Sequence, residues 1–470
     1  MSLAIPSSGT SRRRSTGYCK SCFEKQLKID ELVEENKQLK ARLRYRERKE
    51  KEGFFGASTP SSKLPVKETT PEENRKKKGG ARVGHQGHGR KSHEADTVIS
   101  LEGPTVCPEC GGELVVVEMR DRAVIESTPT KPGRLLYRIP HSRCKNCKKL
   151  IRTHPPGVLP KSLYGNRLIA QLAVMHYYHG IPMGRISEMT GINVGSIVEI
   201  YHRLFRLFRQ VMETLIEEYR RSPVRHADET GWRNDGQSGY AWLFCTSILA
   251  IFLFKNTRSS SVPKGVFGSE ELPGVLVVDR YAGYNKLPVM IQYCYAHLLR
   301  DVEKLEKDCP DDKEVTHFAA SLIPLLAQAM HLKAQDIPDE DYYRRAQELK
   351  KKIMAICRSP AHHLGIRAIQ DIFTINEDRL FHWVRDRSVP ADNNYAERNL
   401  RPTVIARKVS FGSSSDAGAE TRSVLMSVVH TLNKRRGQAT LESAFKSILD
   451  QIVENPDVDV TSLFPTANHT

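Results

Sequence analysis

Hydrophobic positions change their spacing several times along this chain. From 163 to 220 apolar residues recur at helical intervals, which predicts a series of amphipathic helices. After Pro223 the pattern turns to runs of β-branched and aromatic residues, which predicts strands in "PVRHADE", "YAWLFCTSILAIFLF" and "GVLVVDRYAGYN". Residues 296 to 385 return to helical spacing, and one more helix carries "DNNYAERNLRP". We therefore expect a mixed α/β domain at 221–436, with a helical insertion at about 300–388.

Two acidic residues follow the predicted strands. The run Val275 to Val278 is apolar throughout, as expected for a strand buried on both faces of a partly parallel sheet, and it ends in Asp279. Asp228 ends the strand that we predict at 224 to 228. Ligands of α/β sheets collect at the carboxyl ends of strands, which makes both acids candidate ligands. Alternation along the strand places Asp228 and the adjacent Glu229 on opposite faces, and locally either acid reads equally well as a loop residue.

The N-terminal segment, 1–52, contains one predicted helix. Residues 23 to 50 are rich in Glu, Lys, Leu and Arg and contain neither Gly nor Pro. Apolar residues and one Asn recur with heptad spacing, as in a short parallel coiled coil that pairs two chains. The alternative is a lone solvated helix. The heptad positions are Ile29, Leu32, Asn36, Leu39 and Leu43.

The next segment, 53–98, is a basic flexible linker by composition. It is rich in Ser, Thr, Pro, Gly, Lys and Arg, and such a composition cannot form a core. It is either a plain tether or an arm whose cations contact DNA phosphates; we favour the arm. Its candidate phosphate contacts are Lys76, Lys77 and Lys78.

Two CxxC pairs predict a zinc ribbon at 99–155. "CPEC" and "CKNC" supply Cys107, Cys110, Cys144 and Cys147, separated by a hairpin-sized insert. Four thiolates with this spacing form a closed tetrahedral Zn²⁺ site, whose role is structural. A single further pair, Cys19 and Cys22, has no second pair nearby and stays unassigned.

The helical segment 160–220 contains a candidate helix-turn-helix motif. In "RISEMTGINVGSIVEIYHRL", Ser187, Gly191 and Ile197 suit two helices joined by a tight turn. The second helix, from about Val194, would enter the major groove. Our candidate DNA contacts here are Arg185 and Ser196.

Charge and composition narrow the class of partner. The net charge of +17 and the pI near 9.4 favour a polyanion such as nucleic acid, although a solubilising surface is the alternative. The longest mostly apolar stretch, 241–254, is too short to span a bilayer, and the N-terminus does not resemble a secretory signal. We expect no membrane anchor and a reducing cytosol, where the ten cysteines are thiols or metal ligands.

A third carboxylate joins the two at the strand ends. Glu397 forms an i, i+4, i+8 stripe with Asn393 and Arg401 on a polar helix face, and we expect Pro402 to end or kink that helix. Asp228, Asp279 and Glu397 are suited to hold two Mg²⁺ ions about 4 Å apart, as in phosphodiester chemistry. For Glu397 alone, the alternative is a surface salt bridge with Arg401.

Four sequence blocks resemble those of the insertion sequence 66 family of bacterial DDE transposases. They are "HADETGW", "VVDRYAGYN", "CYAH" and "NNYAERNLRPTVIARKVSFGS". The predicted coiled coil, basic linker, paired CxxC module and helix-turn-helix also occur in the order of that family. The resemblance covers the chain from about residue 23.

The resemblance implies specific roles. It makes Asp228, Asp279 and Glu397 the catalytic, Mg²⁺- or Mn²⁺-binding triad of an RNase H-like core. The Cys-x-x-His element of the family falls on Cys294 and His297, which are either metal ligands or a structural thiol and a hydrogen-bonded histidine. The chain departs from many DDE transposases at Val404, where they carry a basic residue. The nearest cations, which we take as candidate DNA contacts, are Arg398, Arg401, Arg407 and Lys408.

The expected function is therefore DNA transposition. A transposase of this type cuts element ends and joins the 3′-OH to target DNA, acts as a homo-oligomer in the bacterial cytoplasm at the nucleoid, and often needs co-encoded accessory proteins. One alternative is a transposase-derived DNA-binding or regulatory protein that does not cut. Another is a structure-specific nuclease on the same fold. We assign no role to the C-terminal segment, 437–470.

Overall fold

The computed structural model describes residues 132–138 and 155–464, the backbone of 141–143 and 150–152, and a few single residues near the N-terminus. The single residues are all helical and are Lys25, Lys28, Ile29, Leu32 and Asn36. The basic linker, the four paired cysteines and most of the predicted coiled coil lie outside the described residues.

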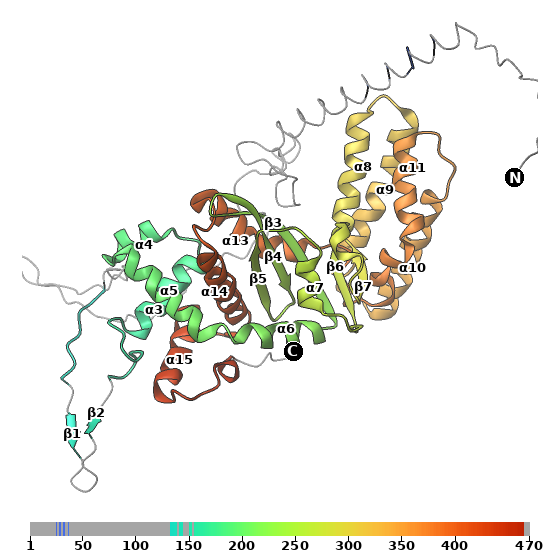
Figure 1. The fold of residues 1–470 in the computed structure, drawn as a ribbon. Coiled ribbons are helices and arrows are strands. Elements are labelled where there is room, and N and C mark those ends of the chain that lie inside the picture. The colour runs from blue at the N-terminus through green and yellow to red at the C-terminus, as the bar shows by residue number, and fades with distance from the viewer. Residues whose placement is uncertain are drawn as a thin grey trace, which may run out of the picture.

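A mixed five-stranded sheet lies at the centre of the described fold (Figure 1). The strand order is β5-β4-β3-β6-β7. The first three strands of this sheet form an antiparallel meander, whereas β6 and β7 run parallel to β3. This order and these directions are compatible with an RNase H-like core. The bounds are β3 Val224–Asn234, β4 Gln237–Cys245, β5 Ala250–Lys255, β6 Val275–Val278 and β7 Met290–Tyr293.

Strand β3 is longer than the sequence pattern predicted, so Asp228 lies inside the strand and not at its end. The sequence pattern placed the end of this strand at Asp228. Instead the chain turns at Asp235 and Gly236, both of which have positive φ, 48° and 72°. An Asp-Gly pair with two positive φ angles is the turn that best matches the twist of a hairpin. The β3–β4 hairpin therefore extends β3 well past Asp228.

The two faces of the sheet are covered by different helices. Aromatic side chains on one face, Trp242 and Phe244, contact Tyr284, Tyr219 and Phe267. These three come from the elements η3, α6 and α7, whereas helix α13 packs against β3 and β4 on the other face. The bounds are α6 Val211–Arg221, α7 Ser261–Phe267, η3 Ala282–Tyr284 and α13 Asn394–Ser410.

Helix α14 (Asp416–Arg435) lies along the edge strand β5 and satisfies its free backbone groups. Ser423, Ser427 and Thr431, spaced four residues apart, accept hydrogen bonds from the backbone N–H groups of Phe254, Phe252 and Ala250 at 3.1, 2.8 and 3.1 Å. An uncovered edge would offer these groups to another strand. The serine and threonine stripe therefore closes this edge of the sheet.

The chain before the sheet forms helices that pack with α14 and α15 (Figure 1). A three-residue turn containing Gly191, at φ 71°, joins α4 to α5, and α5 begins at Val194 as the pattern predicted. Upstream, β1 and β2 form a two-stranded antiparallel hairpin. The bounds are β1 His141–Arg143, β2 Leu150–Arg152, α3 Asn166–Tyr177, α4 Met183–Thr190, α5 Val194–Phe208, α15 Leu441–Glu454 and η5 Val460–Leu463.

A helical layer separates β7 from α13 in the sequence and stands beside the sheet (Figure 1). Of the described helices, α9 alone is long and apolar enough to cross a membrane by length and composition, with a mean hydropathy of 1.3. It packs against α8 and α10 through buried residues such as Phe318 and Leu322. The bounds are α8 Tyr295–Asp308, α9 Lys313–Leu332, α10 Asp339–Cys357, α11 Leu364–Ile375, η4 Glu377–Arg379 and α12 His382–Arg385.

Helix α13 continues through Pro402, so this proline does not end the helix, which was one of the two outcomes that we expected. A proline inside a helix costs the hydrogen bond that its missing N–H would make. On both sides of Pro402 the helix buries apolar residues against the sheet, including Leu400 and Val404. This packing outweighs the local preference, and the helix ends only before Phe411, whose φ is 61°.

Candidate active site

Asp228 lies in the middle of β3 with a side chain that is only 3% exposed. Its Oδ1 accepts a hydrogen bond from the backbone N–H of Glu229 at 2.9 Å. Because His226 belongs to the same face of the strand and bonds to Asn393 of the α13 N-terminus, Asp228 faces α13. Asp228 is therefore fixed on a rigid central strand.

Asp279 directly follows β6, and the strand register places it beside Asp228. Strands β3 and β6 are parallel, with His226 opposite Val277. Continuing this register by two residues sets Asp228 opposite Asp279, with both side chains on one face of the sheet. The Oδ1 of Asp279 accepts the backbone N–H of Tyr281 at 2.9 Å, which orients the carboxylate at the strand end.

Glu397 lies in the first turn of α13 and points toward α8. Its Oε1 pairs with Nη2 of Arg300 at 3.1 Å. The surface salt bridge with Arg401, which the spacing allowed, is not formed. A carboxylate near a helix N-terminus is also stabilised by the helix dipole. The helix thus brings the third acid to the side of the sheet that carries Asp228.

Asn393 joins the elements that carry the acids. This residue is 1% exposed and sits at the N-cap of α13. Its Nδ2 donates to the carbonyl oxygen of Ala227 at 2.8 Å, and its Oδ1 accepts from Nδ1 of His226 at 2.9 Å. Its backbone N–H donates to Sγ of Cys294 at 3.1 Å. One residue therefore connects α13 to β3 and to the start of α8.

The pKa values of Asp228 and Asp279 are both raised in this site. Burial raises the pKa of Asp228 well above its usual range, and the negative charges of Glu229, Asp279 and Glu397 raise it further. Burial also raises the pKa of Asp279, against the lowering effects of the Tyr281 N–H and nearby arginines. Packing like charges in a buried place is unfavourable unless cations neutralise them. The cluster therefore has the electrostatics of a cation site.

Glu229 points away from this cluster into a separate network. Its Oε1 accepts from Nε and Nη2 of Arg258 at 2.9 and 2.7 Å, and its Oε2 accepts from the hydroxyl of Tyr284 at 2.6 Å. The Arg258 guanidinium also lies 4.2 Å from the centre of the Tyr281 ring. The alternation along β3 thus separates the two neighbouring acids, although Asp279 interacts with both.

The oxygen donors of Asp228, Asp279 and Glu397 fit hard cations such as Mg²⁺ or Mn²⁺. Within the described residues, the group of metal-ligating atoms that lie within 4.8 Å of one another is a different one, formed by Cys294, His297 and Glu397. The three carboxylates are spread more widely. Together these oxygens would hold divalent cations, which would supply Lewis-acid chemistry at a phosphodiester.

Cys294 and His297 lie at the start of α8, close to Glu397. Burial raises the pKa of the Cys294 thiol to about 12 and lowers that of His297 to about 3. One alternative for His297 was a hydrogen-bonded histidine. Its Nδ1 makes no such bond, because this buried atom has no hydrogen-bond partner among the described residues.

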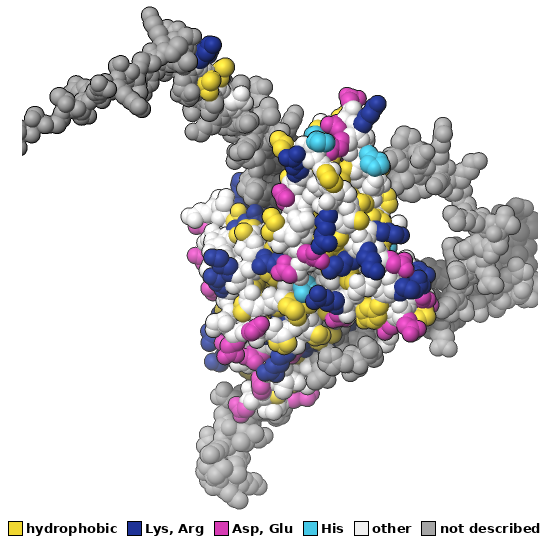
Figure 2. Space-filling model, turned by 90° about the vertical axis from the view of Figure 1, so that its right-hand side faces the viewer, with side chains coloured by type: hydrophobic (Ala, Val, Ile, Leu, Met, Phe, Trp, Pro, Cys, Tyr) yellow, Lys and Arg dark blue, Asp and Glu magenta, His cyan; other side chains and the backbone are white. Residues whose placement is uncertain are grey.

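The candidate DNA contacts fall into separate groups. Arg398, Arg401 and Lys408 are exposed on α13. Arg407 instead donates from Nη1 to Oγ1 of Thr230 at 3.0 Å and so helps to hold α13 on β3. Figure 2 looks onto the side formed by the α8–α11 layer, where Lys and Arg side chains are spread between acidic ones without one continuous basic patch.

The other candidate residues come before the sheet in the sequence. Arg185 is exposed on α4, and Ser196 is half-buried in the first turn of α5. Lys76, Lys77, Lys78 and the cysteines Cys107, Cys110, Cys144 and Cys147 lie outside the described residues. Cys144 and Cys147 belong to the segment that joins β1 to β2.

The sequence pattern missed three residues that shape the site. Arg258 and Tyr284 hold Glu229, and Arg300 holds Glu397. Arg300 follows His297 by three positions, so the two side chains lie on the same face of the helix. This spacing could have indicated that Arg300 belongs to the site. No local spacing indicates Arg258 or Tyr284, because their partner is 29 and 55 residues away.

Comparison with known proteins gives matches of two kinds. The family described as "Transposase IS66 family" matches residues 161–421, and a domain of unknown function, DUF6431, matches residues 107–185. Two proteins of Sinorhizobium fredii (strain NBRC 101917 / NGR234) are each 24% identical to the chain. The uncharacterized protein y4qI aligns over 70% of this chain and 68% of its own length.

The second relative, the uncharacterized protein y4jD, aligns over 38% of each chain. Neither name states an activity. The family match covers more than half of the 470 residues and contains β3, β6, α8 and α13, the elements that carry the acids and the Cys-x-x-His element. The chain belongs to the IS66 family of transposases.

Proposed function

We propose that this protein is an active DDE transposase, which cuts the ends of an insertion sequence and joins the 3′-OH to target DNA by two-metal chemistry. The observation that carries this proposal is the meeting of Asp228, Asp279 and Glu397 from β3, β6 and α13. Membership of a transposase family supports DNA as the substrate. The electrostatics of the cluster support a need for divalent cations.

In this mechanism the three carboxylates hold Mg²⁺ or Mn²⁺. Such ions, when bound, supply Lewis-acid stabilisation to the attacking and leaving oxygens of a phosphodiester. The chain supplies rigid geometry: Asp228 is fixed in the sheet, and Asn393 fixes the helix that carries Glu397. Arg258 keeps Glu229 occupied, so that the adjacent acid does not compete for the cations.

In this proposal, basic side chains on α13 contact the DNA that approaches the acids. We assign phosphate contacts to Arg398, Arg401 and Lys408, which are exposed on the helix that carries Glu397. We assign recognition of the element ends to the α4–α5 pair, through Arg185 and Ser196, and to the basic arm with Lys76, Lys77 and Lys78. A positively charged chain of net charge +17 supports such contacts.

The remaining segments have supporting roles in this proposal. The four paired cysteines hold a structural Zn²⁺ and shape a zinc ribbon. The heptads of 23–50 pair two protomers, and Ile29 and Leu32 are 52% and 48% exposed in the single chain. The homo-oligomer acts in the bacterial cytoplasm at the nucleoid, with co-encoded accessory proteins where the element supplies them.

A strand-transfer assay tests the proposal. Purified protein is incubated with Mg²⁺ or Mn²⁺, a supercoiled target plasmid and a short linear DNA duplex. The duplex has the sequence that flanks the gene, and its end carries a free 3′-OH. We expect covalent joining of this DNA to the plasmid, and no joining when the 3′ end is a dideoxynucleotide. Cutting that ignores end sequence and never joins would instead indicate a nuclease. Specific binding without cutting or joining would indicate a regulatory protein.

A further inference from the structure

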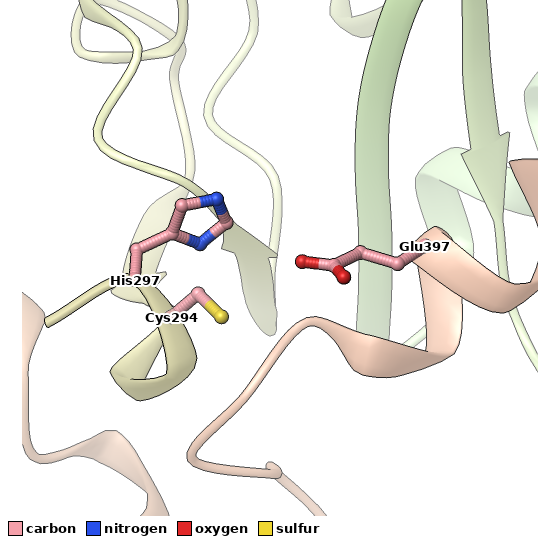
Figure 3. A group of neighbouring side chains, drawn as sticks. All are labelled: Cys294, His297 and Glu397. Atoms are coloured by element: carbon pink, nitrogen blue, oxygen red, sulfur yellow. The ribbon is translucent and has the colours of Figure 1, made fainter. Parts of the chain in front are cut away.

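Cys294, His297 and Glu397 converge on one small space between two helices. Cys294 is the N-cap of α8, His297 lies in the first turn of that helix, and Glu397 reaches across from α13. One ligand atom from each residue lies within 4.8 Å of the other two. Figure 3 shows the three side chains pointing toward one another from the two helices. Small side-chain rotations would bring these atoms to a common ion.

The Cys294 sulfur is placed as a hydrogen-bond acceptor. The residue is fully buried, and its Sγ accepts the backbone N–H of Asn393 at 3.1 Å. It also lies at the positive end of the α8 dipole, which favours a negatively charged sulfur. Donation from the backbone opposes the effect of burial, which raises the pKa of the Cys294 thiol to about 12. A cation beside the sulfur would add the positive charge that favours the thiolate, the form in which cysteine binds a metal.

His297 has an unused nitrogen in the same space. Its Nδ1 is buried and has no hydrogen-bond partner in the described part of the chain. Buried polar atoms in native proteins are nearly always paired, so an unpaired one calls for an explanation. In Figure 3 the imidazole ring lies above Cys294, on the side that faces Glu397. A bound cation would supply the missing partner of Nδ1.

Glu397 has one oxygen left for a ligand. Its Oε1 pairs with Nη2 of Arg300 at 3.1 Å, whereas Oε2 has no hydrogen bond to any described residue. A carboxylate that is held by one oxygen and binds a metal through the other is a common arrangement, since the outer contact orients the ligand. Arg300 would therefore orient Glu397 without blocking the site.

The donor set selects a class of ion. Sulfur, imidazole nitrogen and one carboxylate oxygen suit Zn²⁺ and related borderline-soft cations, whereas Mg²⁺ prefers oxygen donors only. Three protein ligands leave a fourth position open, unlike the closed four-cysteine site predicted for the ribbon. This chemistry differs from that of the three carboxylates, although both groups use Glu397.

We propose that Cys294, His297 and Glu397 form a second metal site, which takes a zinc-class divalent cation and shares Glu397 with the carboxylate cluster. Occupancy of this site draws Glu397 toward α8 and away from Asp228. Zinc bound there would consequently oppose Mg²⁺-dependent cleavage; this consequence alone rests on the proposed function.

Zinc counting on the full-length protein tests the site without any DNA reaction. Wild type and variants are equilibrated with the same small excess of free Zn²⁺. The zinc bound per chain is then measured by elemental mass spectrometry. We expect C294S and H297Q to bind about one zinc ion fewer than wild type. The ribbon cysteines are unchanged in both variants, so the difference reports the new site.

Cys357→Ser is the matched control, because Cys357 is also a buried free thiol but lies at the end of α10. It should bind as much zinc as wild type. If C294S fails to fold by circular dichroism, H297Q still decides the question, since His297 is only partly buried. Equal zinc content in wild type, the control and folded H297Q would overturn the proposal.

The consequence for cleavage has its own readout. At a fixed Mg²⁺ concentration, each protein's rate of DNA nicking is compared with its own rate without zinc. Rising Zn²⁺ should slow nicking by wild type and by the Cys357→Ser variant. It should not slow nicking by H297Q. Inhibition that persists in folded H297Q would overturn this consequence. A protein that never nicks DNA, yet loses one zinc in H297Q, would refute the proposed function while supporting the metal site.

Discussion

The side-chain amide of Asn393 donates a hydrogen bond to the carbonyl oxygen of Ala227, with an Nδ2–O distance of 2.8 Å. Ala227 precedes Asp228 on β3, and Asn393 begins the helix that carries Glu397. This buried contact thus joins the strand that carries Asp228 to the helix that carries Glu397, two acids that are 169 residues apart in the sequence.

Replacing Asn393 by Ala should therefore harm catalysis more than DNA binding. The change leaves the Ala227 carbonyl and the His226 Nδ1 without their partner, at a cost of about 1–3 kcal/mol for each buried group. A shift of Glu397 by about 1 Å would lower the cleavage rate by roughly 100-fold. Single-turnover cleavage and DNA-binding titrations separate the two effects.

Asn399→Ala is the control for this prediction. Asn399 lies on the same helix, and within the described residues its Nδ2 bonds only to the backbone oxygen of Tyr395 one turn earlier. Its variant should cleave at close to the wild-type rate. A folded Asn393→Ala variant with a normal cleavage rate would contradict the positioning role.

Asp228→Asn should raise the thermal stability of the metal-free protein at neutral pH. Because the folded pKa of Asp228 lies above its unfolded value near 4, ionisation destabilises the fold increasingly as the pH rises through this interval. Asparagine keeps the acceptor for the Glu229 N–H and removes the charge. Each kcal/mol relieved should raise Tm by about 2–4 °C.

The pH and metal dependence of this gain are the checks. The difference in Tm between variant and wild type should shrink as the pH falls, and should vanish below about 4, where Asp228 becomes protonated in both states. Added Mg²⁺ should stabilise wild type more than the variant. If Asp228→Asn lowers Tm at pH 8 without divalent ions, the acids do not repel one another as proposed.

The sequence predicted the elements of this site better than their ends and their partners. The apolar run before Asp279 identified β6, because four buried residues in a row suit a central parallel strand. The end of β3 was misplaced at Asp228, whereas the better turn signal was the Asp235-Gly236 pair. Pro402 misled for a similar reason: packing of α13 on the sheet overrides a local rule.

The contacts that hold the acids were beyond any local pattern. Glu397 pairs with Arg300, 97 residues earlier, and not with Arg401, four residues later. A helical stripe shows which residues share a face, but only the tertiary fold decides what lies opposite that face. The spacing therefore identified Glu397 as a candidate. The salt bridge with Arg401, which the spacing suggested as the alternative, was wrong.

The four paired cysteines should hold one zinc ion per chain that survives dialysis. Four thiolates bind Zn²⁺ far more tightly than a site with three protein ligands, so this ion should co-purify without added zinc. Metal analysis of Cys144→Ser should show about one ion fewer than wild type. Unchanged zinc content in Cys144→Ser would count against the ribbon.

Deleting residues 23–50 should lower the oligomeric state of the protein on DNA. The heptad residues Ile29 and Leu32 are about half exposed in the single chain, as expected if another helix covers them. Single-strand nicking should persist in part, because the acids lie in another region of the chain. Light scattering in the presence of end DNA measures the mass; an unchanged mass would defeat the idea.

The most direct test compares the two neighbouring acids of β3. Asp228→Asn and Glu229→Gln each remove one charge at nearly constant size, from side chains that are 3% and 1% exposed. Cleavage of end DNA with Mg²⁺ or Mn²⁺ is measured for both, beside DNA binding and circular dichroism. We predict that Asp228→Asn binds DNA but does not cut it, while Glu229→Gln still cuts. Equal loss of cutting in both folded variants would contradict the assignment of Asp228 as the metal ligand.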